Sequence, residues 1–354
     1  MSVGTHETAM ADLFRAQADL CGQLGSPLYA GLLPRCADDI AAGGPLWTAL
    51  RDLAGCPADA YPALRLLGSV HRLVLAGQAP ALAAHYPSVG GSPGADVWPV
   101  FRSVVIEHTA TIATLVRRPP QTNEVGRAAS LLGGFLQVAR ETGLPLRLLE
   151  VGASAGLNLS WDRYRYESAG WAWGAAGAPL RLTDVYVDTP PAALADVGVD
   201  VVERLGCDLS PVDVSSEDGE LTLRSYVWPD QLDRIERLRS AIRIARAMSV
   251  RVEQAGAIDW LKQRLAAARP GTATVVFHSI VLSYFDTAGR REFERLLADA
   301  GELATAAAPL AWLSLERHDG RFEVRLRIWP GDGERLLAVT GGHGPPVRWL
   351  ADAV

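Results

Sequence analysis

The spacing of hydrophobic residues changes near residue 146 and divides the chain into two parts. In the first part, positions such as Leu64, Leu67, His71 and Val74 recur every three or four residues, which is the spacing of one helix face. Gly and Pro separate these stretches, and alternating strand patterns are absent. The pattern predicts helices over residues 7–24, 26–41, 45–53, 61–76, 98–117 and 122–142.

In the second part, short apolar runs alternate with helical ones. The runs predict strands over residues 147–151, 199–204, 250–253, 274–278, 310–315, 322–329 and 335–340. Helices are expected near residues 156–163, 231–247, 259–268 and 287–300. Strands that alternate with helices indicate a parallel sheet with helices on both faces. Pro330-Gly-Asp-Gly333 leaves no room for a helix, so the sheet is expected to finish in an antiparallel hairpin.

A chain of 354 residues exceeds the usual size of a single hydrophobic core. Together with the change in pattern, this length predicts an α-helical cap domain over residues 1–145 and an α/β domain over residues 146–354.

The charge and cysteine content narrow the class of protein. Lys and Arg number 34 against 40 Asp and Glu, so no basic excess is available for a general nucleic-acid binder. No apolar run is long enough to span a membrane, the first residues do not resemble a signal peptide, and the four cysteines form no Cys-x-x-Cys pair. We therefore expect a cytoplasmic monomer or homodimer that acts on a small molecule, without nucleic-acid or membrane partners.

A small-residue turn follows the first predicted strand. The strand ends in Glu150, and Gly152-Ala-Ser-Ala-Gly156 leads into a helix start. Gly152 permits a tight turn, and Gly156 lets the helix approach the sheet. Such a turn at the carboxyl end of a strand is typical of a site for a nucleoside-like ligand.

The same letters also spell Gly-x-Ser-x-Gly, the nucleophile elbow of α/β-hydrolases. Ser154 would then be the nucleophile, with Asp208 or Asp259 and His278 or His343 as its partners. That elbow follows several strands, whereas a long helical part precedes it here, and no His-Gly-Gly motif is present. The hydrolase hypothesis stays open as the weaker one, and the glycine spacing does not fit a nicotinamide dinucleotide site.

The order of elements, with the Gly-rich turn after the first strand and a hairpin at the end, resembles the class I S-adenosylmethionine-dependent methyltransferases over about residues 146–350. Gly152 and Gly156 match the outer glycines of their acidic-x-Gly-x-Gly-x-Gly motif, and Ser154 replaces the central one. The whole chain also resembles an uncharacterised, mainly actinobacterial family of unknown function. The segments that carry this second resemblance are residues 121–127, 150–159, 206–211, 227–231 and 277–279.

The methyltransferase resemblance implies a Rossmann-like sheet, S-adenosyl-L-methionine as cofactor and no metal. Asp208 after the second strand would bind the ribose, although Asp162, Glu167 and Asp184 compete for that role. Asp259 would bind the adenine, or would only cap the following helix. The expected cofactor-binding residues are Gln121, Asn123, Glu150, Gly152, Ala153, Ser154, Gly156, Asn158, Asp208, Leu209, Ile258, Asp259, His278 and Ser279.

The candidates for chemistry follow the fourth strand, which faces the reacting methyl group in that fold. His278 is the expected general base, because the ordinary pKa of histidine lies near neutrality. Tyr284 is a second candidate, Glu107 in the helical part is a third, and residues 316–318 after the fifth strand are weaker ones of the same type.

These residues predict a small-molecule methyltransferase or an enzyme that performs another reaction of the same sulfonium. A non-catalytic binder of the cofactor or of a nucleoside is the alternative from a different class.

Overall fold

The computed structural model describes residues 3–94, 96–188, 191–331 and 333–350. The chain forms two compact units, and each unit is built from two segments. The helical unit contains Met1–Thr122 and Ser215–Glu236, and the sheet unit contains Asn123–Val214 and Arg237–Val354. The sequence predicted a single boundary at residue 145, and the units differ from that prediction at two segments.

The helical unit is built around α1 and α2, which pack along each other, and a core that includes Phe14, Leu32, Leu66 and Phe101. Its helices are α1 (Val3–Gln23), α2 (Pro27–Ala41), α3 (Pro45–Leu50), α4 (Pro62–Leu75), α5 (Pro80–Ala83), α6 (Trp98–Glu107), α7 (Thr109–Leu115) and α9 (Glu217–Ser225). Short 3-10 turns lie at η1 (Arg51–Leu53), η2 (Ala58–Ala60) and η3 (Pro87–Val89). The helices predicted before residue 117 are confirmed, except that the chain leaves the helical conformation at His108 and divides one of them into α6 and α7.

The first difference from the predicted boundary is the segment 215–236, which joins the helical unit. Trp228 lies in the core of that unit, and Asp230 accepts hydrogen bonds from the Ser26 hydroxyl and the Leu28 backbone. The Ser225 carbonyl lies 3.1 Å from Nδ1 of the buried His71. The sequence analysis missed α9, although Ser216 caps it and acidic residues fill its first turn.

The sheet unit contains a nine-stranded sheet in the order β5-β12-β11-β10-β9-β8-β1-β6-β7. The strands are β1 (Leu146–Val151), β5 (Tyr186–Val187), β6 (Val201–Asp208), β7 (Arg251–Gln254), β8 (Ala273–Ser279), β9 (Leu310–His318), β10 (Arg321–Trp329), β11 (Glu334–Gly341) and β12 (Gly344–Trp349). The pairs from β7 to β9 are parallel, those from β9 to β12 are antiparallel, and β5 runs parallel to β12. The predicted α/β class with a mostly parallel sheet is confirmed.

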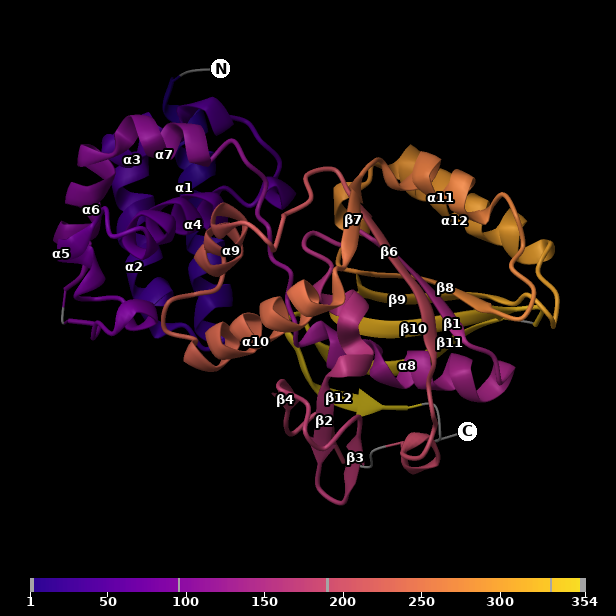
Figure 1. The fold of residues 1–354 in the computed structure, drawn as a ribbon. Helices are drawn as coiled ribbons and strands as arrows, with labels where there is room; N and C mark the ends of the chain where they lie inside the picture. The colour runs from indigo at the N-terminus through magenta and orange to yellow at the C-terminus, as the bar shows by residue number, and fades with distance from the viewer. Residues whose placement is uncertain (1–2, 95, 189–190, 332, 351–354) are drawn as a thin grey trace. The chain divides into compact units, whose positions relative to one another are not determined.

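Helices cover both faces of this sheet, as the sequence predicts. Figure 1 shows α8 (Arg127–Thr142) along one face and α11 (Ala257–Leu265) and α12 (Thr287–Glu302) along the other. The helix α10 (Leu232–Met248) begins in the second segment of the helical unit and continues into the sheet unit. In the sheet unit, η4 (Leu157–Arg163), η5 (Ala192–Leu194) and η6 (Leu282–Tyr284) are 3-10 turns.

The second difference from the predicted boundary is α8, which belongs to the sheet unit. Its residues 128–139 are all buried, which is the mark of a helix enclosed on every side. A Cβ atom at Gly133 would lie 2.3 Å from the Trp349 ring, and one at Gly134 would lie 2.2 Å from Leu313 Cδ1. The two glycines therefore let the sheet approach the helix backbone.

The end of the sheet contains more antiparallel pairing than the sequence analysis expected. The predicted hairpin is confirmed as β10 and β11, although Asp332 of its turn lies outside the described residues. The chain also turns directly from β9 into β10 through Asp319 and Gly320, with φ values of 46° and 85°. These are the backbone angles of a tight hairpin turn, so a hairpin takes the place of the fifth expected strand–helix unit.

Two smaller features were not predicted. A three-stranded sheet is inserted after η4, with β2 (Arg165–Ser168) between β3 (Trp171–Trp173) and β4 (Arg181–Leu182). β12 adds a further antiparallel strand after β11. Within the described part of the chain, we find no helix that has both the length and the apolar character needed to cross a membrane.

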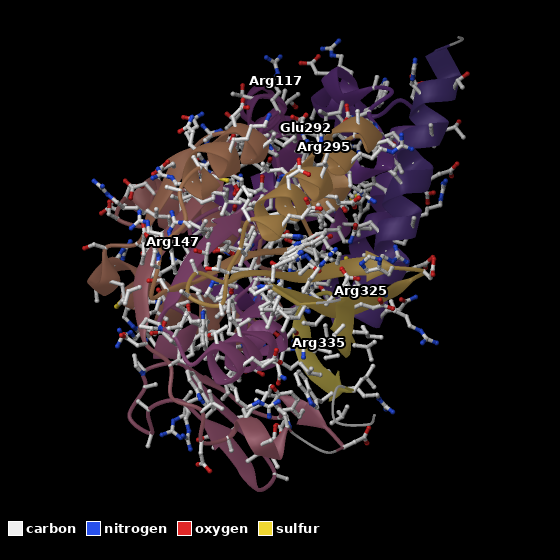
Figure 2. All side chains as sticks on the ribbon, turned by 90° about the vertical axis from the view of Figure 1, so that its right-hand side faces the viewer. Arg117, Arg147, Glu292, Arg295, Arg325 and Arg335 are labelled. Atoms are coloured by element: carbon white, nitrogen blue, oxygen red, sulfur yellow. The ribbon has the colours of Figure 1, made fainter. Side chains whose placement is uncertain are left out.

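Ion pairs link neighbouring elements of the sheet unit. Arg335 on β11 contacts Glu141 on α8 at 2.7 Å, and Lys262 on α11 contacts Glu292 on α12 at 2.8 Å. Figure 2 labels Arg335 and Glu292. These exposed pairs contribute little to stability. Arg147 on β1 is buried, and its Nε donates to Glu203 on β6 at 2.7 Å.

Candidate functional site

The strand β1 lies at the point of the sheet where the chain order changes direction. Its neighbours are β6 on one side and β8 on the other, and Glu150 is in register with Gly206 and Phe277. Ligands of open α/β sheets bind outside the carboxyl ends of the strands at such a point. Residues 152–156, which we call the Gly turn, follow β1 here.

The backbone of the Gly turn requires small residues. Gly152, Ser154 and Gly156 have φ values of 68°, 53° and 71°, in the left-handed region that favours glycine. A Cβ atom at Gly152 would lie 2.4 Å from Cγ2 of Val281, and one at Gly156 would lie 2.6 Å from Cγ1 of Val250. Ser154 therefore adopts a strained conformation, which is common at functional sites. The helix expected after the turn is the 3-10 segment η4, with a kink at Ser160.

The end of β6 holds the Gly turn in place. Asp208 Oδ2 accepts a hydrogen bond from the Ser154 backbone at 2.9 Å, and Oδ1 accepts one from the Ser210 backbone at 2.8 Å. The Ala153 backbone donates to the Cys207 carbonyl at 3.0 Å. Asp208 therefore braces the turn, and each of its oxygens keeps a second lone pair for a ligand.

Glu150 before the Gly turn and Asn158 after it carry buried acceptor atoms. Glu150 is only 2% exposed, and its Oε2 has no hydrogen-bond partner among the described residues. Oδ1 of the buried Asn158 also has no hydrogen-bond partner among the described residues. Burial raises the pKa of Glu150 well above its ordinary value and the charge of Asp208 raises it further, whereas the Asn158 hydrogen bond and the Arg127 charge lower it less.

Two residues of the segment before α8 form hydrogen bonds with the start of η4. Asn123 Oδ1 accepts from the Leu157 backbone at 2.9 Å, and the Glu124 carbonyl accepts from Asn158 Nδ2 at 3.5 Å. Asn123 and Glu124 are both buried, so these polar residues support η4 and do not form a solvent-exposed helix cap. Gln121 belongs to the helical unit.

His278 is fully buried at the end of β8, and both of its ring nitrogens are bound. The Trp312 indole donates to Nε2 at 2.9 Å, and Nδ1 lies 2.7 Å from Glu316 Oε1. An indole N–H can only donate, so Nε2 is the acceptor and Nδ1 carries the proton that it donates to Glu316. The expected role of His278 as a general base does not fit this geometry, because no ring lone pair remains to accept a proton from a substrate.

Glu316 is the partner of His278 that the sequence analysis ranked below it. Burial raises the pKa of this carboxyl, but the interaction with His278 and the hydrogen bonds from Val281 and Leu282 outweigh burial, so the pKa lies below its ordinary value. Arg127 belongs to the segment 121–127 that the sequence singled out, whereas Trp312 was not expected at the site. Only the pairing of β9 with β8 brings Trp312 to His278, and no local motif indicates that contact.

A family model described as "Uncharacterized protein conserved in bacteria (DUF2332)" matches residues 11–349. The chain belongs to this family. The expected resemblance to an uncharacterised bacterial family is thus confirmed, and the match runs through both units of this DUF2332 chain. No curated protein and no solved structure matches the chain.

Three further expected site residues lie near the ends of the parallel strands. The Ser279 carbonyl accepts from Arg127 Nη1 at 3.2 Å. Leu209 after β6 is 73% exposed, and Tyr284 after β8 is 51% exposed. Leu209 and Tyr284 both follow strands that flank β1 in the sheet.

The other expected residues have different surroundings. Asp259, in the first turn of α11, has an 87% exposed side chain that lies 3.9 Å from Lys262. Ile258 packs against the core between the sheet and α11. Glu107 is exposed on α6, in the helical unit, beside His108.

The two buried oxygens of Glu150 and Asn158 indicate which ligand groups the site can bind. Glu150 Oε2 and Asn158 Oδ1 have no hydrogen-bond partner among the described residues, and a buried polar atom without a partner destabilises the folded protein by about 1–3 kcal/mol. A ligand group that carries N–H donors and a positive charge would satisfy both atoms. A cation with N–H donors, such as an ammonium group, is therefore a chemically suitable partner for these two atoms.

Proposed function

We propose that the sheet unit binds S-adenosyl-L-methionine and that the chain is a small-molecule methyltransferase, or an enzyme that uses the same sulfonium in another reaction. Two features support a Rossmann-like site of the class I type. The parallel strands follow the spatial order third, second, first, fourth and fifth along the chain, and the Gly turn follows the first of them. The hairpin β9–β10 departs from the strand–helix repeat only after the fifth strand.

The observation that carries the proposal is the unpartnered buried oxygen of Glu150. An amino-acid ammonium group offers three N–H donors to the Glu150 and Asn158 oxygens, and its charge favours the ionised carboxylate. Among common nucleoside ligands, S-adenosylmethionine carries such a group and nucleotides do not.

The remaining residues have roles that suit the rest of this ligand. Asp208 keeps lone pairs that can accept from two ribose hydroxyls while it holds the Ser154 backbone. Leu209 offers exposed apolar surface for a base ring. When bound, the sulfonium supplies a methyl group for in-line transfer.

Because both ring nitrogens of His278 are bound, the methyl acceptor cannot depend on this residue as a base. Positioning of the acceptor against the Gly turn carries the catalysis, since the nearest expected base has both ring nitrogens bound. The proposal therefore favours an acceptor that needs no side-chain base, such as an unprotonated amine or a thiolate. Tyr284, an exposed side chain after β8, would be available to contact this acceptor.

Calorimetric titration tests the proposal with three ligands. S-adenosylmethionine and S-adenosylhomocysteine carry the ammonium group, and 5′-methylthioadenosine lacks it. We expect Glu150→Gln to weaken the first two by about 10- to 100-fold, the value of a charged hydrogen bond of about 1.5–3 kcal/mol, and to leave the third unchanged. Glu334→Gln, which changes a β11 carboxylate bound to Arg325, is the matched control.

Failure of wild-type protein to bind any of the three ligands would overturn the proposal. If the ligands bind but no acceptor is methylated, the bound His278 favours the alternative of a non-catalytic binder. The hydrolase hypothesis is supported by one observation: Ser154 has a positive φ, as the nucleophile of a nucleophile elbow does. Covalent labelling of Ser154 by a fluorophosphonate would support that reading.

A further inference from the structure

The loop after β8 touches the Gly turn directly. Val281 Cγ2 occupies the space where a Cβ atom of Gly152 would stand, 2.4 Å from its ideal position. Any shift of residues 279–282, which we call the β8 loop, therefore changes the space at the Gly turn. What holds this loop determines the shape of the site.

The β8 loop is held in a conformation that it would not adopt by itself. Ile280 has a φ of 54°, which is costly for a β-branched residue. The Ile280 backbone donates to the Leu315 carbonyl at 2.8 Å, and Arg127 of α8 donates to the Ser279 carbonyl. These contacts fix the start of the loop, and the part that touches Gly152 needs a separate anchor.

One carboxylate oxygen supplies that anchor. Oε1 of Glu316 accepts from the Val281 backbone at 2.9 Å, from the Leu282 backbone at 3.3 Å and from His278 Nδ1 at 2.7 Å. The side chain is 7% exposed, so solvent does not compete for these donors. Trp312 fixes the tautomer of His278 that donates to Glu316.

We propose that Glu316 is a positioning residue that holds the β8 loop against the Gly turn, with His278 and Trp312 as its support. Its charge strengthens three hydrogen bonds at once, and two of them end on the loop backbone. Removal of the charge weakens the hydrogen bonds from the Val281 and Leu282 backbone, and the strain at Ile280 then draws the loop away from Gly152. The consequence for cofactor affinity rests on the proposed function, whereas the position of the loop does not.

Amide hydrogen exchange of ligand-free protein tests the anchor. Glu316→Gln keeps the size of the side chain and removes its charge, so we expect exchange at Val281 and Leu282 to rise about tenfold. Glu323→Gln is the control, because Glu323 lies opposite Glu316 on β10 but pairs with Arg325. Wild-type exchange rates at both amides in Glu316→Gln, or the same rise in the control, would overturn the proposal.

A second variant covers the case in which Glu316→Gln does not fold. Trp312→Phe keeps a ring at the same place and removes the N–H that His278 accepts. We expect the ring nitrogen-15 spectrum of His278 to change from a single tautomer with Nδ1 protonated to a mixture, with faster exchange at Val281. A spectrum that stays unchanged would contradict the support assigned to Trp312 and His278.

Titration with S-adenosylmethionine separates positioning from mere stabilisation. At a temperature where both variants are folded, we expect the Kd to rise about tenfold in Glu316→Gln and to stay unchanged in Glu323→Gln. A carboxylate that only stabilises the fold would lower the Tm and leave the Kd unaltered. If wild-type protein does not bind this ligand, the proposed function fails, and the exchange data still decide the role of Glu316.

Discussion

At the scale of single residues, the buried carboxyl of Glu150, which we propose to recognise the ligand, lowers the stability of the folded protein. Its pKa is raised in the folded protein, so the folded state holds the proton more tightly than the unfolded chain does. The free energy of unfolding of wild-type protein therefore falls as pH rises above the ordinary value of 4.5 and through the raised pKa. Glu150→Gln has no such loss, and we expect it to be more stable by about 1–3 kcal/mol at neutral pH.

Urea unfolding of wild-type and Glu150→Gln protein between pH 4 and pH 8 measures this difference. The gap between the two curves should open as pH rises and should shrink towards pH 4. Two parallel curves would mean that Glu150 titrates as an ordinary surface acid.

The sequence revealed Glu150, Gly152 and Gly156 because one local pattern contains all three. It could not reveal that His278 is occupied, because Trp312 and Glu316 reach it only through strand pairing. The sequence therefore pointed to the candidate site, and the role of general base that it predicted for His278 does not fit the two contacts of that ring.

At the scale of elements, α8 shows how packing overrides a local helical pattern. The sequence assigned this helix to the helical domain, because neither the spacing of its hydrophobic residues nor its place in the chain indicates that it packs against the sheet. The Asp319-Gly320 pair is a typical hairpin-turn sequence and could have indicated the hairpin between β9 and β10. It was overlooked because the preceding strands alternate with helices.

The packing of α8 predicts opposite effects for two helical glycines. Gly134→Ala places a methyl group 2.2 Å from Leu313, which is fully buried, and we expect a loss of about 1–3 kcal/mol from overpacking. Gly31→Ala on α2 meets no atom within 4 Å, and we expect a gain of about 0.5–1 kcal/mol from helix propensity. Chemical unfolding of both variants, read by hydrogen exchange within each unit, compares them. Equal effects of the two substitutions would contradict the close approach of α8 to the sheet.

At the scale of the whole molecule, the chain passes between its units three times, after residues 122, 214 and 236. The helical unit is therefore incomplete until a segment that follows β6 has been made. Trp228 fills its core, Asp230 binds Ser26 and Leu28, and Tyr226 lies against Gly68, where a Cβ atom would be 2.7 Å from the ring. No sequence pattern marks this return, because α9 is a short surface-like helix and only its tertiary partners show where it belongs.

This interleaving predicts that a fragment of residues 1–122 does not fold alone. Loss of Trp228 leaves a core cavity, which for a large aromatic residue costs about 3–5 kcal/mol, a large part of the stability of a typical domain. A peptide of residues 215–236 added to the fragment should restore helical circular dichroism and shift the Trp228 emission to shorter wavelength. A peptide with Trp228→Ala and Asp230→Asn should not. Cooperative unfolding of the fragment without the peptide would contradict this prediction. It would show that the helical unit folds without residues 215–236.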